Sequence, residues 1–187
     1  MKKPPAEIVA SALAVTTIFV SMPPYNLPPW AIFIGWAGTF AAGGPSKAVL
    51  QKIWVTMPIG SFFAFLIVLC FQFASQHLQG SALILSQCVI LFCLNGSMMS
   101  LGRIRALSFI PGMFFGFASY FATMFGGFGP VPHDPYAALL AVVIMNGLGP
   151  LYAWLNARFA SHHARIEEGI GSDGQIEHHG ASHNGAG

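Results

Sequence analysis

Hydrophobic positions along this chain gather in six segments, separated by short stretches rich in Pro, Gly and polar residues. The segments are 7–22, 29–43, 53–74, 81–101, 107–125 and 136–157. Because about 20 apolar residues in a helix span the hydrocarbon core of a bilayer, we expect the first, third, fourth and sixth to be transmembrane helices. The second and fifth are short and bounded by Pro and Gly, which predicts either short tilted spans or broken, Gly/Pro-interrupted helices. The pattern therefore predicts an all-α polytopic membrane protein with six transmembrane helices.

The apolar pattern stops after the sixth segment. Residues 161–187 are rich in Gly, His and Ser and show no apolar periodicity, which is typical of a disordered tail. Its histidines are His162, His163, His178, His179 and His183. They fit either a soluble tail with incidental affinity for metals or a weak metal binder. We therefore divide the chain into a membrane domain, 1–160, and a disordered cytoplasmic tail, 161–187.

Composition supports a membrane environment and excludes other classes of protein. Apolar residues make up 55% of the chain and charged residues 7%, and the mean hydropathy is +0.64. An average soluble domain has roughly 25% charged residues, so a water-facing surface cannot be built from this sequence. The net charge of +2 is spread over the connections between segments and offers no basic surface for nucleic acid.

The basic residues fall on alternate connections. Lys or Arg precedes the first segment, separates the second from the third and the fourth from the fifth, and follows the sixth; the other three connections contain none. The eight residues are Lys2, Lys3, Lys47, Lys52, Arg103, Arg105, Arg158 and Arg165. Cytoplasmic connections of membrane proteins carry an excess of Lys and Arg. The distribution therefore predicts six spans with both termini in the cytoplasm.

A nine-residue sequence in the second segment recurs in the fifth. Residues 33–41 and 114–122 lie 81 residues apart and are identical at five positions. Repeats carried by short membrane segments are typical of transporters and channels. With three spans in each half, about 7–74 and 81–157, the two copies would cross the membrane in opposite directions. The sequence thus predicts a 3+3 inverted-topology repeat, in which sites usually lie near the bilayer midplane.

Both copies of the repeat carry a stripe of small residues on one helical face. The members are Ala31, Gly35, Gly38 and Ala42 in the first copy, and Gly112, Gly116, Ser119 and Thr123 in the second. Small faces let helix backbones approach closely in lipid, so one interpretation is that the two segments cross as packing elements. The other interpretation is that the stripes leave room for a narrow solute path. The two interpretations are compatible.

No Asp, Glu, Lys, Arg or His lies in the middle of a segment. Proton relays and carboxylate ion sites need such groups, so their absence argues against a proton-coupled pump or a cation antiporter and permits a small neutral polar solute. Asn95 and Asn146, each deep in its segment and followed by Gly, either bond neighbouring helices or line a solute path. The candidates for a solute path or a helix crossing are Gly35, Gly38, Thr39, Asn95, Gly112, Gly116, Ser119, Tyr120 and Asn146.

No catalytic, cofactor or metal site is expected. The chain has no Gly-rich phosphate loop, nucleophile elbow or His-Glu-x-x-His sequence, which argues against an enzyme. Cys70, Cys88 and Cys93 lie in apolar segments, where a thiol behaves as a small hydrophobe. His133 and Asp134 form an acid–histidine pair in an outer loop, which is either a solvated turn or a pH-sensitive or metal-binding contact.

The repeated segments also resemble a known family. The similarity lies in Trp30-Ala-x-Phe33-x-Gly35…Phe40-Ala41…Gly43-Gly44…Lys47 and in Ser108-Phe109-Ile-Pro111-Gly112-x-Phe114-x-Gly116…Phe121-Ala122. These motifs are similar to those of small bacterial inner-membrane proteins classed as domain of unknown function 1097, over about residues 10–157. The resemblance implies the six-span architecture and the bacterial inner membrane. It brings no established activity or site, and the His-rich tail has no expected counterpart.

Two functions of different class fit these observations. We expect a channel or facilitator for a small neutral polar solute, because an inverted repeat is typical of transport proteins. The alternative is a non-transporting structural or regulatory membrane subunit, whose repeat serves helix packing or oligomerisation. The shortage of polar residues inside the segments favours this alternative. The expected partners are the lipid bilayer, a small neutral solute and other copies of the chain.

Overall fold

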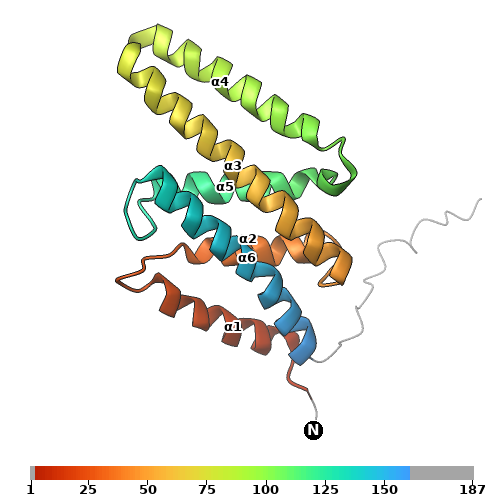
Figure 1. Ribbon diagram of the computed structural model, residues 1–187. Coiled ribbons are helices and arrows are strands. Elements are labelled where there is room, and N and C mark those ends of the chain that lie inside the picture. The colour runs from red at the N-terminus through yellow and green to blue at the C-terminus, as the bar shows by residue number, and fades with distance from the viewer. Residues whose placement is uncertain (1–2, 161–187) are drawn as a thin grey trace, which may run out of the picture.

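The computed structural model describes residues 3–160, which form an all-helical bundle (Figure 1). The helices are α1 (Ala6–Ser21), α2 (Pro29–Ala41), α3 (Lys47–His77), α4 (Gly80–Leu101), the short 3-10 helix η1 (Arg105–Leu107), α5 (Ile110–Phe125) and α6 (Pro135–Phe159). The predicted tail, 161–187, lies outside the described residues. The sequence-based prediction of six helices is therefore confirmed for the described part of the chain.

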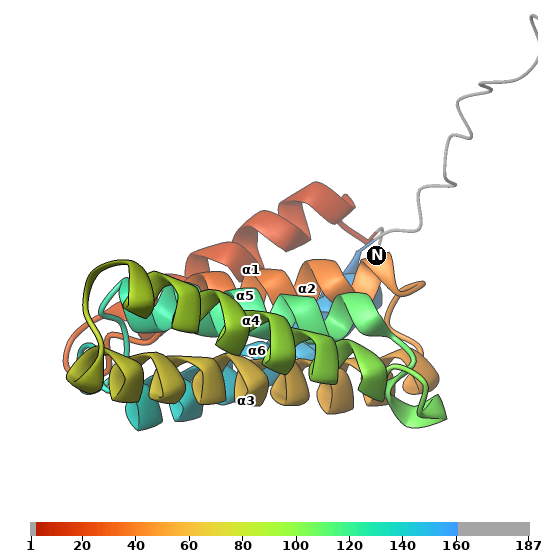
Figure 2. The ribbon, with the colours of Figure 1, turned by 90° about the horizontal axis from the view of Figure 1, so that it is seen from above.

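The helices form two layers that cross each other. Figure 2 shows α3 and α6 on one side of the bundle, and α1, α2 and α5 on the other. The most extensive interfaces join α3 to α5 and α2 to α6. In each of these pairs a helix of one layer crosses a helix of the other. At the two edges, α1 packs against α2 and α6, and α4 packs chiefly against α3 (Figure 1).

Local chemistry sets where the long helices begin. The Ser46 side chain accepts a hydrogen bond from the Val49 backbone N–H and so caps α3. As a result α3 starts at Lys47 and is 31 residues long, well beyond the predicted segment 53–74. Asp134 caps α6 in the same way, by accepting from the Ala137 N–H at 2.7 Å. Polar capping residues, which hydropathy ignores, therefore lengthen the helices past the apolar runs.

The helices of the repeat, α2 and α5, are each short and continuous, so the alternative of broken, Gly/Pro-interrupted helices is not confirmed. Pro29 and Pro111 lie in the first turn of their helices, where proline lacks only an N–H that would have no partner. The flanking glycines follow the last turns, and Gly43 has a φ of 109° there. Pro and Gly thus delimit the two helices, which are 13 and 16 residues long.

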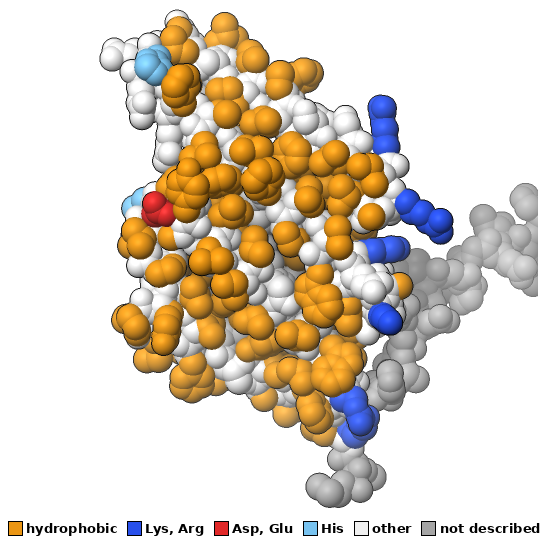
Figure 3. Space-filling model, viewed as in Figure 1, with side chains coloured by type: hydrophobic (Ala, Val, Ile, Leu, Met, Phe, Trp, Pro, Cys, Tyr) orange, Lys and Arg blue, Asp and Glu red, His pale blue; other side chains and the backbone are white. Residues whose placement is uncertain are grey.

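Three helices, α3, α4 and α6, are long and apolar enough to cross a membrane. Helix α1 has 16 residues, as many as the predicted segment 7–22, and extends for roughly 24 Å at 1.5 Å per residue, which is less than a full span of about 20 residues. Large apolar side chains point outward from the bundle, and Phe92 on α4 is 81% exposed. Figure 3 shows hydrophobic side chains across the face in view, with Lys and Arg gathered at one end of it. These are the features of an integral membrane protein.

Candidate functional site

The crossing of α3 and α5 is built on two glycines. A Cβ atom on Gly116 would overlap the carbonyl group of Met57, and one on Gly60 would overlap the carbonyl group of Met113. The Ser61 hydroxyl donates a hydrogen bond of 2.9 Å to the Gly116 carbonyl oxygen across the same contact. The two backbones therefore meet directly, which small residues permit between helices in lipid.

The crossing of α2 and α6 has the same construction. A Cβ atom on Gly35 would lie 2.5 Å from the Asn146 carbonyl oxygen, and one on Gly149 would lie 2.5 Å from the Gly35 backbone. Pro150 has no N–H to donate to the Asn146 carbonyl within α6. The neighbouring Gly147 carbonyl accepts a hydrogen bond of 2.9 Å from the Trp54 indole on α3. This region of α6 thus presents backbone oxygens to both α2 and α3.

The two crossings are made of corresponding residues. Gly35 and Gly116 occupy the same position in the sequence repeat. Gly35 meets Asn146 and Gly149, whereas Gly116 meets Met57, with Gly60 three residues further along α3. Asn146 therefore occupies the position in the α2–α6 crossing that Met57 occupies in the α3–α5 crossing. This substitution is the main chemical difference between the two crossings.

Other members of the predicted stripes contact different neighbours. A Cβ atom on Gly38 would lie 2.9 Å from the Phe115 ring, so α2 touches α5 at this point. A Cβ atom on Gly112 would overlap the Thr56 side chain of α3. At Gly35, Gly38, Gly112 and Gly116 alike, the space that a side chain would need is already filled by protein atoms. The stripes are helix contacts in this structure, but the interpretation that the two repeat segments cross each other was wrong, because α2 packs chiefly against α6 and α5 chiefly against α3.

The Asn146 side chain is buried at the α2–α6 crossing and has nothing to bond to. It is 2% exposed, and neither Nδ2 nor Oδ1 has a hydrogen-bond partner among the described residues. Leaving such an amide unpaired in the folded protein costs about 1–3 kcal/mol. On α5, the Ser119 hydroxyl is likewise fully buried without a partner. Polar capacity is therefore left unused inside the bundle.

The remaining polar candidates are either satisfied or placed elsewhere. Thr39 donates a hydrogen bond of 2.8 Å to the Gly35 carbonyl within α2, and Tyr120 donates one of 3.2 Å to the Pro135 carbonyl. Asn95 lies on α4 at the edge of the bundle (Figure 1), where its Nδ2 reaches only Met99 Sδ at 4.0 Å. The structure therefore does not bring Asn95 together with the two crossings.

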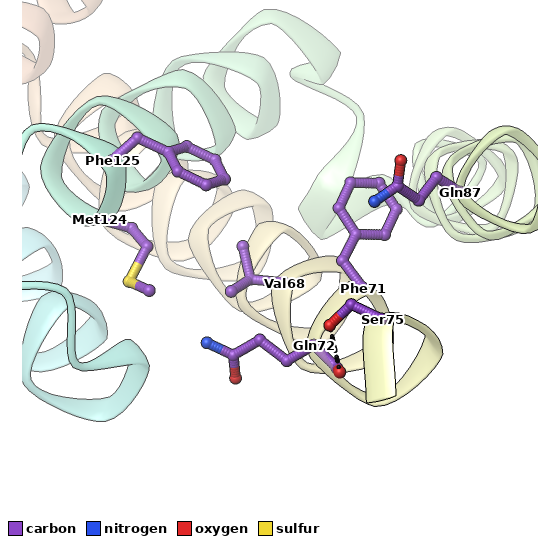
Figure 4. Close-up of a pocket in the computed structure, with 7 residues that line it drawn as sticks. All are labelled: Val68, Phe71, Gln72, Ser75, Gln87, Met124 and Phe125. Carbon is purple, nitrogen blue, oxygen red and sulfur yellow. Dashed lines mark hydrogen bonds between the residues drawn. The ribbon is translucent and has the colours of Figure 1, made fainter. Parts of the chain in front are cut away.

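A cavity of about 320 Å³ opens between α3, α4 and α5. Figure 4 shows the residues around it, which are Val68, Phe71, Gln72, Ser75, Gln87, Met124 and Phe125. The amides of Gln72 and Gln87 come from different helices and are its main polar groups. Val68 and Met124 also belong to the buried cluster that contains Tyr120 and Met145, the residue before Asn146. The cavity thus borders the same apolar core to which Met145 of α6 belongs.

The predicted acid–histidine pair separates into two local contacts. Asp134 caps α6, as described above, and the His133 ring Nδ1 lies 3.2 Å from the Met124 carbonyl oxygen. The Gly129 N–H donates a hydrogen bond of 2.8 Å to the Asn26 carbonyl, which ties this loop to the connection between α1 and α2. Within residues 3–160 no group of three or more His, Cys, Asp or Glu side chains could hold a metal ion. The pair therefore serves a turn.

Sequence reasoning missed Gly60 and Gly149, although each completes a crossing. Their offset differs from that of Gly35 and Gly116, because α5 continues further past its glycine than α2 does and the connection 126–134 is longer than the connection 42–46. A search at the constant spacing of the repeat therefore does not align them. The available signal was a glycine close to a proline, Pro58 in α3 and Pro150 in α6, in the third helix of each half.

Comparison with known proteins identifies a family. The family described as Protein of unknown function (DUF1097) matches residues 7–161. No curated protein matches the chain, and no solved structure does.

Proposed function

The chain belongs to the DUF1097 family of proteins of unknown function, and from that premise we propose that it lets a small neutral polar solute cross the bacterial inner membrane. The observation that carries the proposal is the Asn146 amide, which is buried with both of its polar atoms unpaired. A solute that has both a carbonyl and an N–H, such as urea or a short amide, would pair both atoms.

The solute is neutral because neither the lining of the cavity nor the glycine contacts of the two crossings include a charged side chain. Within residues 3–160 the acidic residues are Glu7, in the first turn of α1, and Asp134, which caps α6. Neither lies at a helix crossing. Ions that cross a membrane need charged side chains or rings of carbonyl dipoles to replace their hydration shell. A neutral solute needs only a few hydrogen bonds, which Asn146 and Ser119 would supply.

The proposed membrane arrangement has six spans in two inverted halves, with both termini in the cytoplasm. The alternation of basic connections supports it, and so does the matched construction of the α2–α6 and α3–α5 crossings. At 13 and 16 residues, α2 and α5 are shorter than a full span. Short helices of this kind suit a position inside a bundle, where the longer helices α3 and α6 border them.

The cavity between α3, α4 and α5 is the proposed entrance. The Gln72 and Gln87 amides would replace water around an entering solute, and Phe71 and Phe125 would contact its apolar parts. Beyond Val68 and Met124 the solute would pass the buried cluster that includes Met145. Methionine side chains are unbranched and flexible, so they can move aside without rearranging the helices.

A second function is favoured by the glycine contacts. Beside every stripe glycine described above, atoms of a neighbouring helix fill the space that a side chain would occupy. This is what close helix packing requires. A protein whose repeat only held helices together would be a structural or regulatory membrane subunit. Under this alternative the unpaired Asn146 amide has no role, and for that reason we place transport first.

Solute permeability distinguishes the two functions. The full chain is reconstituted in liposomes, and stopped-flow light scattering follows swelling in urea, formamide, acetamide and glycerol. We expect faster entry of the amides than in empty liposomes, with glycerol as a neutral control that lacks an amide. Rates equal to those of empty liposomes for all four solutes would contradict the transport proposal and favour the structural alternative.

A further inference from the structure

A second surface depression lies at the end of the bundle where Lys and Arg gather (Figure 3). It is a groove of about 640 Å³ between the start of α3 and η1. Ala48, Gln51, Lys52 and Val55 line one side, at the spacing of a single face of α3, and Arg105 and Ala106 line the other. The groove is therefore formed by two segments far apart in sequence and has a cation on each wall.

The two cations of the groove have no acidic neighbour in its lining. In the described chain Asp134 precedes α6 and Glu7 lies on α1, and neither element forms the groove. Lys52 and Arg105 line the two walls with charges of the same sign, so a bound anion would attract both of them. The groove thus offers two positive charges and the Gln51 amide toward one ligand, with apolar side chains between them.

We propose that this groove binds the phosphate group of an anionic phospholipid headgroup. Lys52 and Arg105 would contact the phosphate oxygens, and Arg in particular presents a planar fork of donors that matches phosphate. Gln51 would bond the glycerol hydroxyls of a lipid such as phosphatidylglycerol. Val55, which is 44% exposed, leads from the groove toward the apolar surface of α3, along which acyl chains would lie. This site is separate from the proposed solute path and does not depend on transport.

Native mass spectrometry of the purified full chain with added phosphatidylglycerol tests the site. The groove variant is Lys52→Gln/Arg105→Gln. The matched control is Lys47→Gln/Arg103→Gln, which removes the same charge from exposed neighbours outside the groove lining. A salt concentration of about 0.15 M limits the reach of unspecific attraction to about 8 Å. Circular dichroism verifies that both variants keep the helical content of the wild type.

We expect the groove variant to bind phosphatidylglycerol on the order of 30-fold more weakly, because each cation near an anionic surface contributes roughly fivefold. The control variant should retain the affinity of the wild type, and phosphatidylcholine should bind weakly to all three. Equal weakening in both variants, or no preference for phosphatidylglycerol over phosphatidylcholine, would overturn the proposal. Inorganic phosphate is the third ligand: binding that depends on Lys52 and Arg105 without retention of lipid would assign the groove to free phosphate instead.

Discussion

Asn146 and Met57 occupy corresponding positions in two corresponding helix contacts, yet burial of their side chains has opposite effects on stability. Met57 is 1% exposed and apolar, so its burial is favourable and its flexible chain fills the available space. Asn146 is equally buried, but its amide has lost its hydrogen bonds to water and gained none. A residue that costs stability without structural compensation is expected where function requires it.

Replacement of the amide by an apolar group of similar shape should stabilise the protein. Asn146→Leu keeps the branching at Cγ and removes both unpaired polar atoms, so we expect the free energy of unfolding to rise by about 1 kcal/mol. Unfolding by sodium dodecyl sulfate, followed by circular dichroism, measures the change. A loss of stability would mean that the amide is engaged in the folded protein, which contradicts its assignment as an open solute contact.

At the scale of helices, the sequence predicted which segments are helical but not how the helices pack against one another. Apolar periodicity and the positions of Pro and Gly predicted six helices, and the repeat identified Gly35 and Gly116 as close contacts. The predicted crossing of the two repeat segments was wrong, because a stripe of small residues specifies a close approach and not which helix approaches. The cavity at Gln72 and Gln87 was also missed, because it depends on how far α4 stands from α5 (Figure 1).

Alanine substitutions test the crossings directly. Gly116→Ala places a methyl group against the Met57 carbonyl, and we expect a loss of about 1–3 kcal/mol from overpacking. The matched control is Gly96→Ala on α4, where a Cβ atom meets nothing within 4 Å. The control should be neutral or gain up to about 1 kcal/mol, because alanine favours helix. Thermal unfolding in detergent compares the two, and equal effects would refute close backbone packing at Gly116.

For the molecule as a whole, the arrangement in the membrane is the property on which transport depends. The proposal places the end of α3 outside and the connection after α4 in the cytoplasm, since only the latter carries Arg. Single cysteines at Gln76 and Ile104, in a variant without Cys70, Cys88 and Cys93, report these two sides. A membrane-impermeant maleimide should label Gln76→Cys in intact cells and Ile104→Cys only after lysis. Labelling of both cysteines from the same side would contradict the proposal that α4 crosses the membrane.

The central claim is that a solute passes the Asn146 amide, and one comparison of variants tests it most directly. Amide entry into proteoliposomes is measured for the wild type, for Asn146→Leu and for Asn95→Leu, which makes the same chemical change on the peripheral helix α4. Our account predicts that Asn146→Leu reduces urea and acetamide permeability at least to about a tenth, corresponding to one lost hydrogen bond of roughly 1.4 kcal/mol, while Asn95→Leu retains the wild-type rate. Equal rates in the wild type and in a correctly folded Asn146→Leu would contradict it.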